Sequence, residues 1–217
     1  LLLPNHLEIG YAEIKKQGLP SAIHLNFEVR DIDGRRIRKG RSFRSAYIGK
    51  KKLVAGNPFS CNGMFIKRQV ALNLKFNEDR NLTNAEDYLL WLEIASRYPI
   101  YTVDTVTSIL VSHSGRSVKD NSLDSLNSRK ELLLKYAFTD RETERFIGAY
   151  KKGIESYSDT YSAIHLVESG DLKNGVKYFI RGIIAYPPSI LDRRTLGIMK
   201  HTFLHIIRKL IHNKARV

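Results

Sequence analysis

Cysteine is almost absent from this chain of 217 residues, in which Cys61 is the only one. A single thiol excludes an internal disulfide framework and is typical of a reducing compartment. Long apolar runs are missing too, and no stretch approaches the ~20 residues that a transmembrane helix needs. No secretory signal opens the chain. We therefore expect a cytoplasmic location.

Acidic residues are missing from two long stretches, one between Gly34 and Asn77 and one from Arg193 to the end. The net charge is +14. Basic fields of this kind attract phosphates, whether in nucleic acid, in anionic lipid head groups or in a nucleotide diphosphate. A solvated basic face without a specific partner accounts more simply for the dispersed positions.

Helix and strand patterns alternate in the first half of the chain. The composition, with 42% hydrophobic residues, eleven Tyr and nine Phe, is that of a globular protein. A period of two predicts that Ile23, Leu25, Phe27 and Val29 lie on one face of a strand, opposite polar residues. The expected helices are 7–16 and 46–53, and the expected strands are 22–30, 35–38, 60–66, 100–103 and 107–111.

Two adjacent carboxylates, Glu86 and Asp87, stand where a strongly apolar helix pattern begins. Such a helix belongs inside a domain. Capping boxes starting at Thr83 and at Asn84 would explain an acid in the first turn, where the helix dipole also favours negative charge. Two consecutive acids are one more than a cap requires, and Asp87 lies away from the polar strip of this helix.

Several short motifs resemble, in their order, the second half of a family 2 glycosyltransferase with the GT-A fold. The resemblance covers about residues 1–118. The motifs are Ser60-Cys61-Asn62-Gly63-Met64-Phe65-Ile66, then Ala85-Glu86-Asp87-Tyr88 with Leu90-Trp91-Leu92, then Ser112-His113-Ser114-Gly115-Arg116-Ser117.

The resemblance implies transfer of a sugar, with inversion, from a nucleotide-sugar donor to a hydroxyl of a glycan or lipid-linked acceptor. Asp87 would be the general base, and Glu86 would cap the helix or contact the acceptor. The substrate-binding residues would be Asn62 and Gly63, which line the donor-sugar pocket, and Trp91, although packing of the helix explains Trp91 more simply. His113 would add a ligand to a divalent metal, Mg²⁺ or Mn²⁺, on the diphosphate.

The main metal ligands of that family belong to an Asp-x-Asp motif, which we expect upstream of this chain. The family places it a few residues before a segment matched by Leu3-Pro4-Asn5-His6-Leu7-Glu8. The expected fold class is α/β, with an incomplete GT-A-type, Rossmann-like mixed sheet in residues 1–118 and an all-α region in residues 119–217. The chain as given should then lack a complete active site.

The second half of the chain has helical patterns only, at 122–136, 140–157, 161–168, 172–186 and from 193 onward. The hairpin 161–186 resembles a single tetratricopeptide-type unit, and we expect it to pack against the first half. Leu196, Met199, Phe203, Ile206 and Leu210 form an apolar stripe on the last helix. This stripe suits either the protein core or the interface of an anionic membrane, so peripheral association with the inner membrane face through 193–217 is an open alternative.

Two other function classes are also open. The basic stretch 35–52, with Phe43 and Tyr47 interleaved, allows contact with nucleic acid. No recognised nucleic-acid motif accompanies it, so we expect no specific nucleic-acid partner. A non-catalytic helical adaptor built on residues 120–217 is the other alternative, and it requires that this half fold alone.

Overall fold

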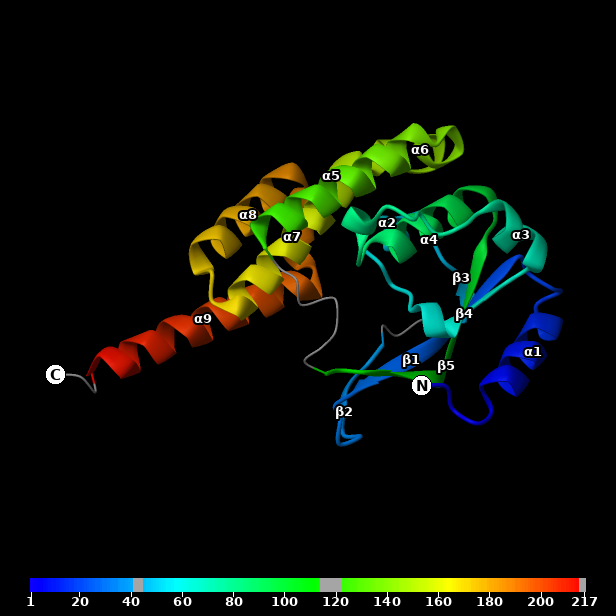
Figure 1. The fold of residues 1–217 in the computed structure, drawn as a ribbon, viewed down its shortest axis with the longest axis horizontal. Coiled ribbons are helices and arrows are strands. Elements are labelled where there is room, and N and C mark those ends of the chain that lie inside the picture. Colours follow the sequence, from blue (N-terminus) through cyan, green and yellow to red (C-terminus); the bar gives the residue numbers. More distant parts are fainter. Residues whose placement is uncertain (41–44, 114–121, 215–217) are drawn as a thin grey trace.

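The described strands form one mixed, five-stranded sheet, in the order β2-β1-β5-β3 with β4 also paired to β1. The computed structural model describes residues 1–40, 45–113 and 122–214 (Figure 1). β1 and β5 run parallel, whereas β2 and β4 pair with β1 and β3 with β5 in antiparallel fashion. The bounds are β1 Ala22–Arg30, β2 Arg36–Lys39, β3 Ala46–Tyr47, β4 Met64–Ile66 and β5 Ile100–Val111. The chain is thus an α/β protein, followed by helices.

β1 has the predicted bounds, and its polar face is as buried as its apolar face. Every residue from Ala22 to Val29 is buried. On one face Ile23 and Leu25 pack with Ile9 and Ile14 of α1 (His6–Lys16). On the other face His24 packs against Phe59. Because both faces are covered, the polar residues of this strand are buried as well.

β5 is one continuous strand, where the sequence predicted two. The register with β1 shifts on either side of Asn26, so that Leu25 pairs with Val103 and Asn26 with Val106. Asn26 fills this irregularity by donating a hydrogen bond of 2.8 Å to Asp104. Leu2 pairs with Ser108 of β5 in an antiparallel bridge. The residues between 103 and 107, where the sequence predicted a gap between two strands, therefore form a bulge inside β5.

The helix predicted for residues 46–53 is wrong in its first half. Ala46 and Tyr47 pair with β5, and the Thr102 hydroxyl donates to the Ala46 carbonyl at 2.7 Å. Pairing with a distant strand thus overrides the local preference. Only α2 (Lys50–Val54) is helical there. The predicted strand 60–66 is likewise shorter, because Cys61–Gly63 form a 3₁₀ turn, η1, before β4.

The helices of the second half differ from prediction at two points. The helix predicted for residues 140–157 is divided into α6 (Arg141–Ile147), the 3₁₀ turn η4 (Gly148–Tyr150) and the first part of α7 (Lys151–Ser169). A break was predicted after residue 157, but α7 runs unbroken through it. The hydroxyls of Ser158, Thr160 and Ser162 donate to carbonyls four residues earlier, which ties these polar residues to the helix. The bounds are α5 Leu123–Thr139, α6 Arg141–Ile147, η4 Gly148–Tyr150, α7 Lys151–Ser169, α8 Leu172–Ala185, η5 Pro187–Leu191 and α9 Arg193–Lys214.

Helix α4 (Glu86–Arg97) lies at the centre of the largest hydrophobic core, as its apolar pattern predicted. Tyr88, Trp91 and Leu92 are buried in it. Leu133 of α5 and Ile154 of α7 belong to the same core, so the core crosses the boundary expected at residues 118 and 119. The short elements η2 (Arg80–Leu82) and α3 (Arg68–Asn73) precede α4. Among the described helices, none is both long and apolar enough to cross a bilayer.

Candidate active site at the start of helix α4

The carboxylate pair begins α4 without a cap. The N-cap residue is Ala85, and no side chain caps the helix there. Thr83 instead donates its hydroxyl to the Arg80 carbonyl, and Asn84 has a left-handed backbone with φ 74°. Both predicted capping boxes are therefore wrong, because the helix starts too late for Thr83 or Asn84 to occupy the N-cap. Capping boxes do not explain the two acids.

Asp87 is half-buried and held from two sides. Its Oδ1 accepts the Tyr88 backbone N–H at 2.7 Å, and its Oδ2 accepts the Asn57 side-chain N–H at 3.0 Å. Burial, followed by the charge of Glu86, raises the pKa of Asp87 to about 6. Removal from water disfavours the charged form of a carboxyl, and a neighbouring carboxylate adds to that cost. Asp87 is thus fixed in position and more basic than a solvated aspartate.

Glu86 has one carboxylate oxygen, Oε2, that is buried and has no hydrogen-bond partner in the part of the chain described. A buried polar atom without a partner costs free energy. Glu86 therefore contributes an unused acceptor beside Asp87.

Cys61 lies beside this pair. Part of the residue reaches the surface, but burial of its thiol, and then the charges of Asp87 and Glu86, raise the pKa of Cys61 to about 12. A thiol with such a pKa is neutral at physiological pH and is a poor nucleophile. The charges of both carboxylates thus act on a residue of η1, the turn that also contains Asn62.

The loop before η1 is anchored on both the sheet and α4. Asn57 uses its side-chain oxygen to accept the Phe59 N–H at 3.1 Å while its amide N–H holds Asp87. The Ser60 N–H donates to Nε2 of His24 on β1 at 3.1 Å. Burial lowers the pKa of His24 to about 3, so this histidine is neutral and can accept. No sequence pattern pointed to either role, because Asn57 reaches Asp87 across 30 residues, and His24 reaches Ser60 across 36 residues, only in the fold.

The predicted substrate-binding residues have different surroundings. Asn62 is partly exposed in η1. Gly63 is buried against β1, where a Cβ would lie 2.1 Å from the Leu25 carbonyl oxygen, so packing alone already requires glycine. Trp91 is 1% exposed and lies edge-to-face with Phe59 and Phe76. The indole has no surface left for a sugar, and the substrate contact predicted for it is therefore corrected to packing of α4.

His113, the predicted metal ligand, is exposed beyond the end of β5. None of the contacts described for residues 1–40, 45–113 and 122–214 joins it to Glu86 or Asp87. The same residues contain no group of three or more His, Cys, Asp or Glu that could hold a metal ion. A hard divalent cation needs several oxygen ligands. The described residues therefore do not by themselves fit the expected Mg²⁺ or Mn²⁺.

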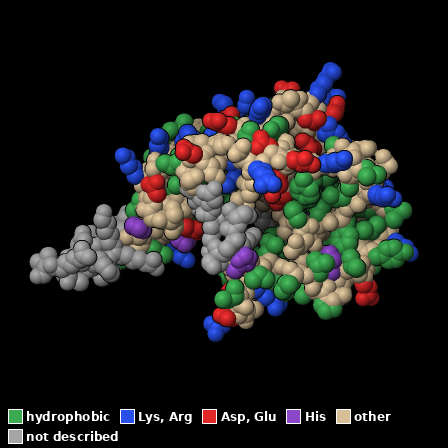
Figure 2. All heavy atoms as spheres, viewed as in Figure 1, with side chains coloured by type: hydrophobic (Ala, Val, Ile, Leu, Met, Phe, Trp, Pro, Cys, Tyr) green, Lys and Arg blue, Asp and Glu red, His purple; other side chains and the backbone are tan. Residues whose placement is uncertain are grey.

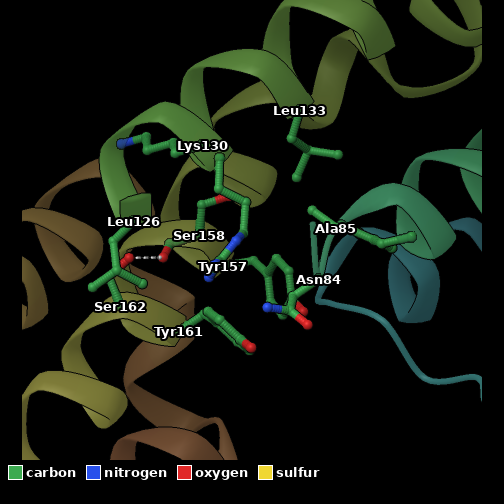
Figure 3. A pocket seen from close by; sticks show the side chains of 11 residues that line it. Asn84, Ala85, Leu126, Lys130, Leu133, Tyr157, Ser158, Tyr161 and Ser162 are labelled. Atoms are coloured by element: carbon green, nitrogen blue, oxygen red, sulfur yellow. Dashed lines mark hydrogen bonds between the residues drawn. The ribbon is translucent and has the colours of Figure 1, made fainter. Parts of the chain in front are cut away.

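A narrow cavity lies between the start of α4 and the C-terminal helices, and neither Glu86 nor Asp87 is among its lining residues (Figure 3). Its volume is about 30 Å³, enough for water but not for a sugar. An open groove of about 550 Å³ shares Asn84 and Arg129 with it. The cavity is lined by Asn84, Ala85 and Tyr88, by Leu126, Arg129, Lys130 and Leu133 of α5, and by Tyr157, Ser158, Tyr161 and Ser162 of α7.

Electrostatics link the cavity to Asp87. Burial, then Tyr157 and Asp87 among the charged groups, raise the pKa of Tyr161 to about 12, so this phenol remains a hydrogen-bond donor. Lys130 is engaged by Asp159, with both carboxylate oxygens 2.8 Å from Nζ. The groove and the cavity therefore lead from solvent toward the start of α4, between two halves of the chain.

On the face seen in Figure 2, acidic and basic side chains are interspersed over the helices, as expected of a solvated surface.

Comparison of the sequence with protein-family models and with curated proteins found no match.

Proposed function

We propose that this chain is the acceptor-side part of an inverting, family 2-type glycosyltransferase in which Asp87 is the general base. The observation that carries the proposal is the state of Asp87: a half-buried carboxylate with a pKa of about 6, held by Asn57 and the Tyr88 N–H at the head of a buried helix. A general base works best when its pKa lies near the working pH and its position is fixed. The uncapped start of α4 removes the main structural explanation for the two acids.

In the proposed reaction the acceptor hydroxyl gives its proton to Asp87 as its oxygen attacks the anomeric carbon of the donor. The bond between that carbon and the diphosphate oxygen breaks, and the nucleoside diphosphate leaves with the electron pair. Attack opposite the leaving group inverts the configuration. At neutral pH Asp87 is mostly ionised, because its pKa of about 6 lies below 7.

Glu86 is the proposed acceptor contact. Its capping role is excluded by the position of Ala85, and its buried Oε2 can accept from a second acceptor hydroxyl. Asn62 is the proposed donor-side contact, because it is the residue of the Asn62–Gly63 pair that retains exposed surface. The groove that shares Asn84 and Arg129 with the cavity offers a path for the acceptor.

The parallel pairing of β1 with β5, and the order of η1, α4 and β5, support a GT-A-type sheet. A divalent cation on the diphosphate is expected from the resemblance. Since the described residues do not form that site, no step above depends on it.

The test uses the protein encoded by the complete reading frame and a panel of nucleotide sugars, with release of nucleoside diphosphate as the measurement. Asp87→Asn keeps the shape of the side chain and removes its basicity, so transfer should fall by about 10² to 10⁴. Asp33→Asn, in the exposed hairpin turn, is the matched control and should be active. Release that is equal in Asp87→Asn and wild type would refute the role of Asp87, and no release from any donor would refute the reaction class.

A further inference from the structure

The segment from α8 to α9 exposes a series of large apolar side chains. Ile184 at the end of α8 is 74% exposed and Leu191 in η5 is 86% exposed. Leu196 and Phe203 on α9 are 64% and 63% exposed. The other exposed apolar residues of the segment are Val176, Ile180, Tyr186, Ile190, Met199 and Leu204.

These residues are not the ones that attach the segment to the protein. α8 buries Gly175, Tyr178 and Gly182 against its neighbours, and α9 buries Ile198 and Thr195. α8, η5 and α9 follow one another in the chain and contact one another. Within the described part of the chain nothing covers the exposed side. The stripe predicted on the last helix is therefore outside the described core at Leu196, Met199 and Phe203. Exposed apolar side chains also occur on η5 and α8, where the sequence had predicted only packing.

The net charge of this segment is strongly positive. Between Leu172 and Lys214 the only acid is Asp192. The basic residues there are Lys173, Lys177, Arg181, Arg193, Arg194, Lys200, Arg208, Lys209 and Lys214. Lys173 and Lys177 are exposed on α8 and Lys200 is exposed on α9, whereas Arg181 forms an ion pair with Asp159 of α7. Exposed apolar and cationic side chains thus occur together on each of these two helices.

We propose that α8, η5 and α9 form a surface that binds an anionic phospholipid membrane. The apolar side chains would enter the boundary between head groups and acyl chains, and the Lys and Arg side chains would contact the head groups, as in interfacial amphipathic helices. A second copy of the chain is a poorer occupant, because a symmetric contact would place these cations opposite one another. Figure 1 shows α9 extending away from the sheet and the other helices, where a surface can reach it. The proposal does not depend on the glycosyltransferase assignment.

The test is co-sedimentation of the whole chain with vesicles of phosphatidylcholine, with and without phosphatidylglycerol. Binding should require phosphatidylglycerol and should weaken as salt rises, because salt screens the head-group charge. The double variant Ile184→Ser with Leu196→Ser should lower the partition coefficient by roughly tenfold or more. In the wild type both apolar side chains move from water into the membrane, and serine gains nothing from that transfer. Both sites are exposed, so the fold should be retained.

The matched control is Ile32→Ser with Leu7→Ser, which removes apolar residues 74% and 68% exposed elsewhere on the molecule. The control should bind like wild type. Equal binding to neutral and anionic vesicles, no binding to either, or equal loss in both double variants would each overturn the proposal. A further outcome would also overturn it: light scattering shows a dimer, the Ile184→Ser, Leu196→Ser variant is a monomer, and neither protein binds vesicles. The surface would then join two copies of the chain.

Depth of insertion gives a second, independent measurement. Trp91 is 1% exposed and should be shielded from quenchers in the lipid. Tryptophan placed by Ile184→Trp or Phe203→Trp should be quenched by brominated acyl chains in anionic vesicles. Tryptophan placed by Ile32→Trp should not. Absence of quenching at both positions of the segment would refute insertion even if the protein sediments with the vesicles.

Discussion

Replacement of Asp87 by Asn should change the stability of the protein in a way that depends on pH. The pKa of Asp87 rises from 3.8 to about 6 on folding, so the folded protein binds this proton more tightly than the unfolded chain does. The group therefore favours folding while it is protonated, and that contribution is lost as the pH rises from about 4 through 6. Ionised Asp87 costs about 3 kcal/mol of folding free energy above that range.

Asn at this position keeps the acceptor for the Tyr88 N–H but places an N–H₂ group opposite that of Asn57. Asn57 cannot turn its amide without losing its bond to the Phe59 N–H, so one hydrogen bond is lost, at about 1 kcal/mol. We expect Asp87→Asn to be less stable than wild type by about 1 kcal/mol at pH 4, and more stable by about 2 kcal/mol at pH 8. The protein would thus gain stability at neutral pH while losing the proposed general base.

The assay is urea denaturation of both proteins at several pH values between 2 and 8, with the difference in unfolding free energy as the result. Asp140→Asn is a control of opposite sign. The Arg97 guanidinium holds the pKa of Asp140 at about 2 in the folded protein. Ionised Asp140 therefore stabilises the fold above pH 3.8, and this stabilisation is lost as the pH falls toward 2. A stability difference for Asp87→Asn that is constant from pH 4 to 8, or that grows more unfavourable as the pH rises, would refute the reasoning.

Three further outcomes are expected. Asp159 is 1% exposed and neutralises two cations, so Asp159→Ala should cost about 3 to 5 kcal/mol in denaturant unfolding; a loss under 1 kcal/mol would contradict the buried pairing. Gly63→Ala should lower the melting temperature, because the new Cβ would lie 2.1 Å from a backbone oxygen. Gly153→Ala in α7 is the control: its Cβ would meet nothing within 4 Å, so it should be neutral or stabilise the protein by about 0.5–1 kcal/mol. Residues 119–217 expressed alone should lack a cooperative thermal transition, because α5 and α7 share their core with α4; a cooperative transition would revive the helical adaptor.

Local patterns determined those parts of the protein whose physical cause is also local. The β1–β2 turn has Gly34 at φ 81°, and Asp31 accepts N–H groups of Asp33 and Arg35, which are properties of the Asp-x-Asp-Gly segment itself. The bounds of β1 and the burial of α4 also follow from runs of apolar residues. The adjacent carboxylates could be singled out because Asp87 interrupts the apolar surface of its own helix.

Tertiary structure decided what depends on partners far away in the chain. Ala46 and Tyr47 are a strand only because β5 offers an edge to pair with. α7 is continuous at Asp159, where the sequence predicted a break between two helices. Lys130 and Arg181 neutralise the buried Asp159 carboxylate there.

The candidate site was decided in the same way. The raised pKa of Asp87 depends on burial and on Glu86, and its orientation depends on Asn57, 30 residues earlier. A sequence specifies which residues can be acids, donors and apolar contacts. Their desolvation and their hydrogen-bond partners exist only once the sheet, α4 and the C-terminal helices have closed around them.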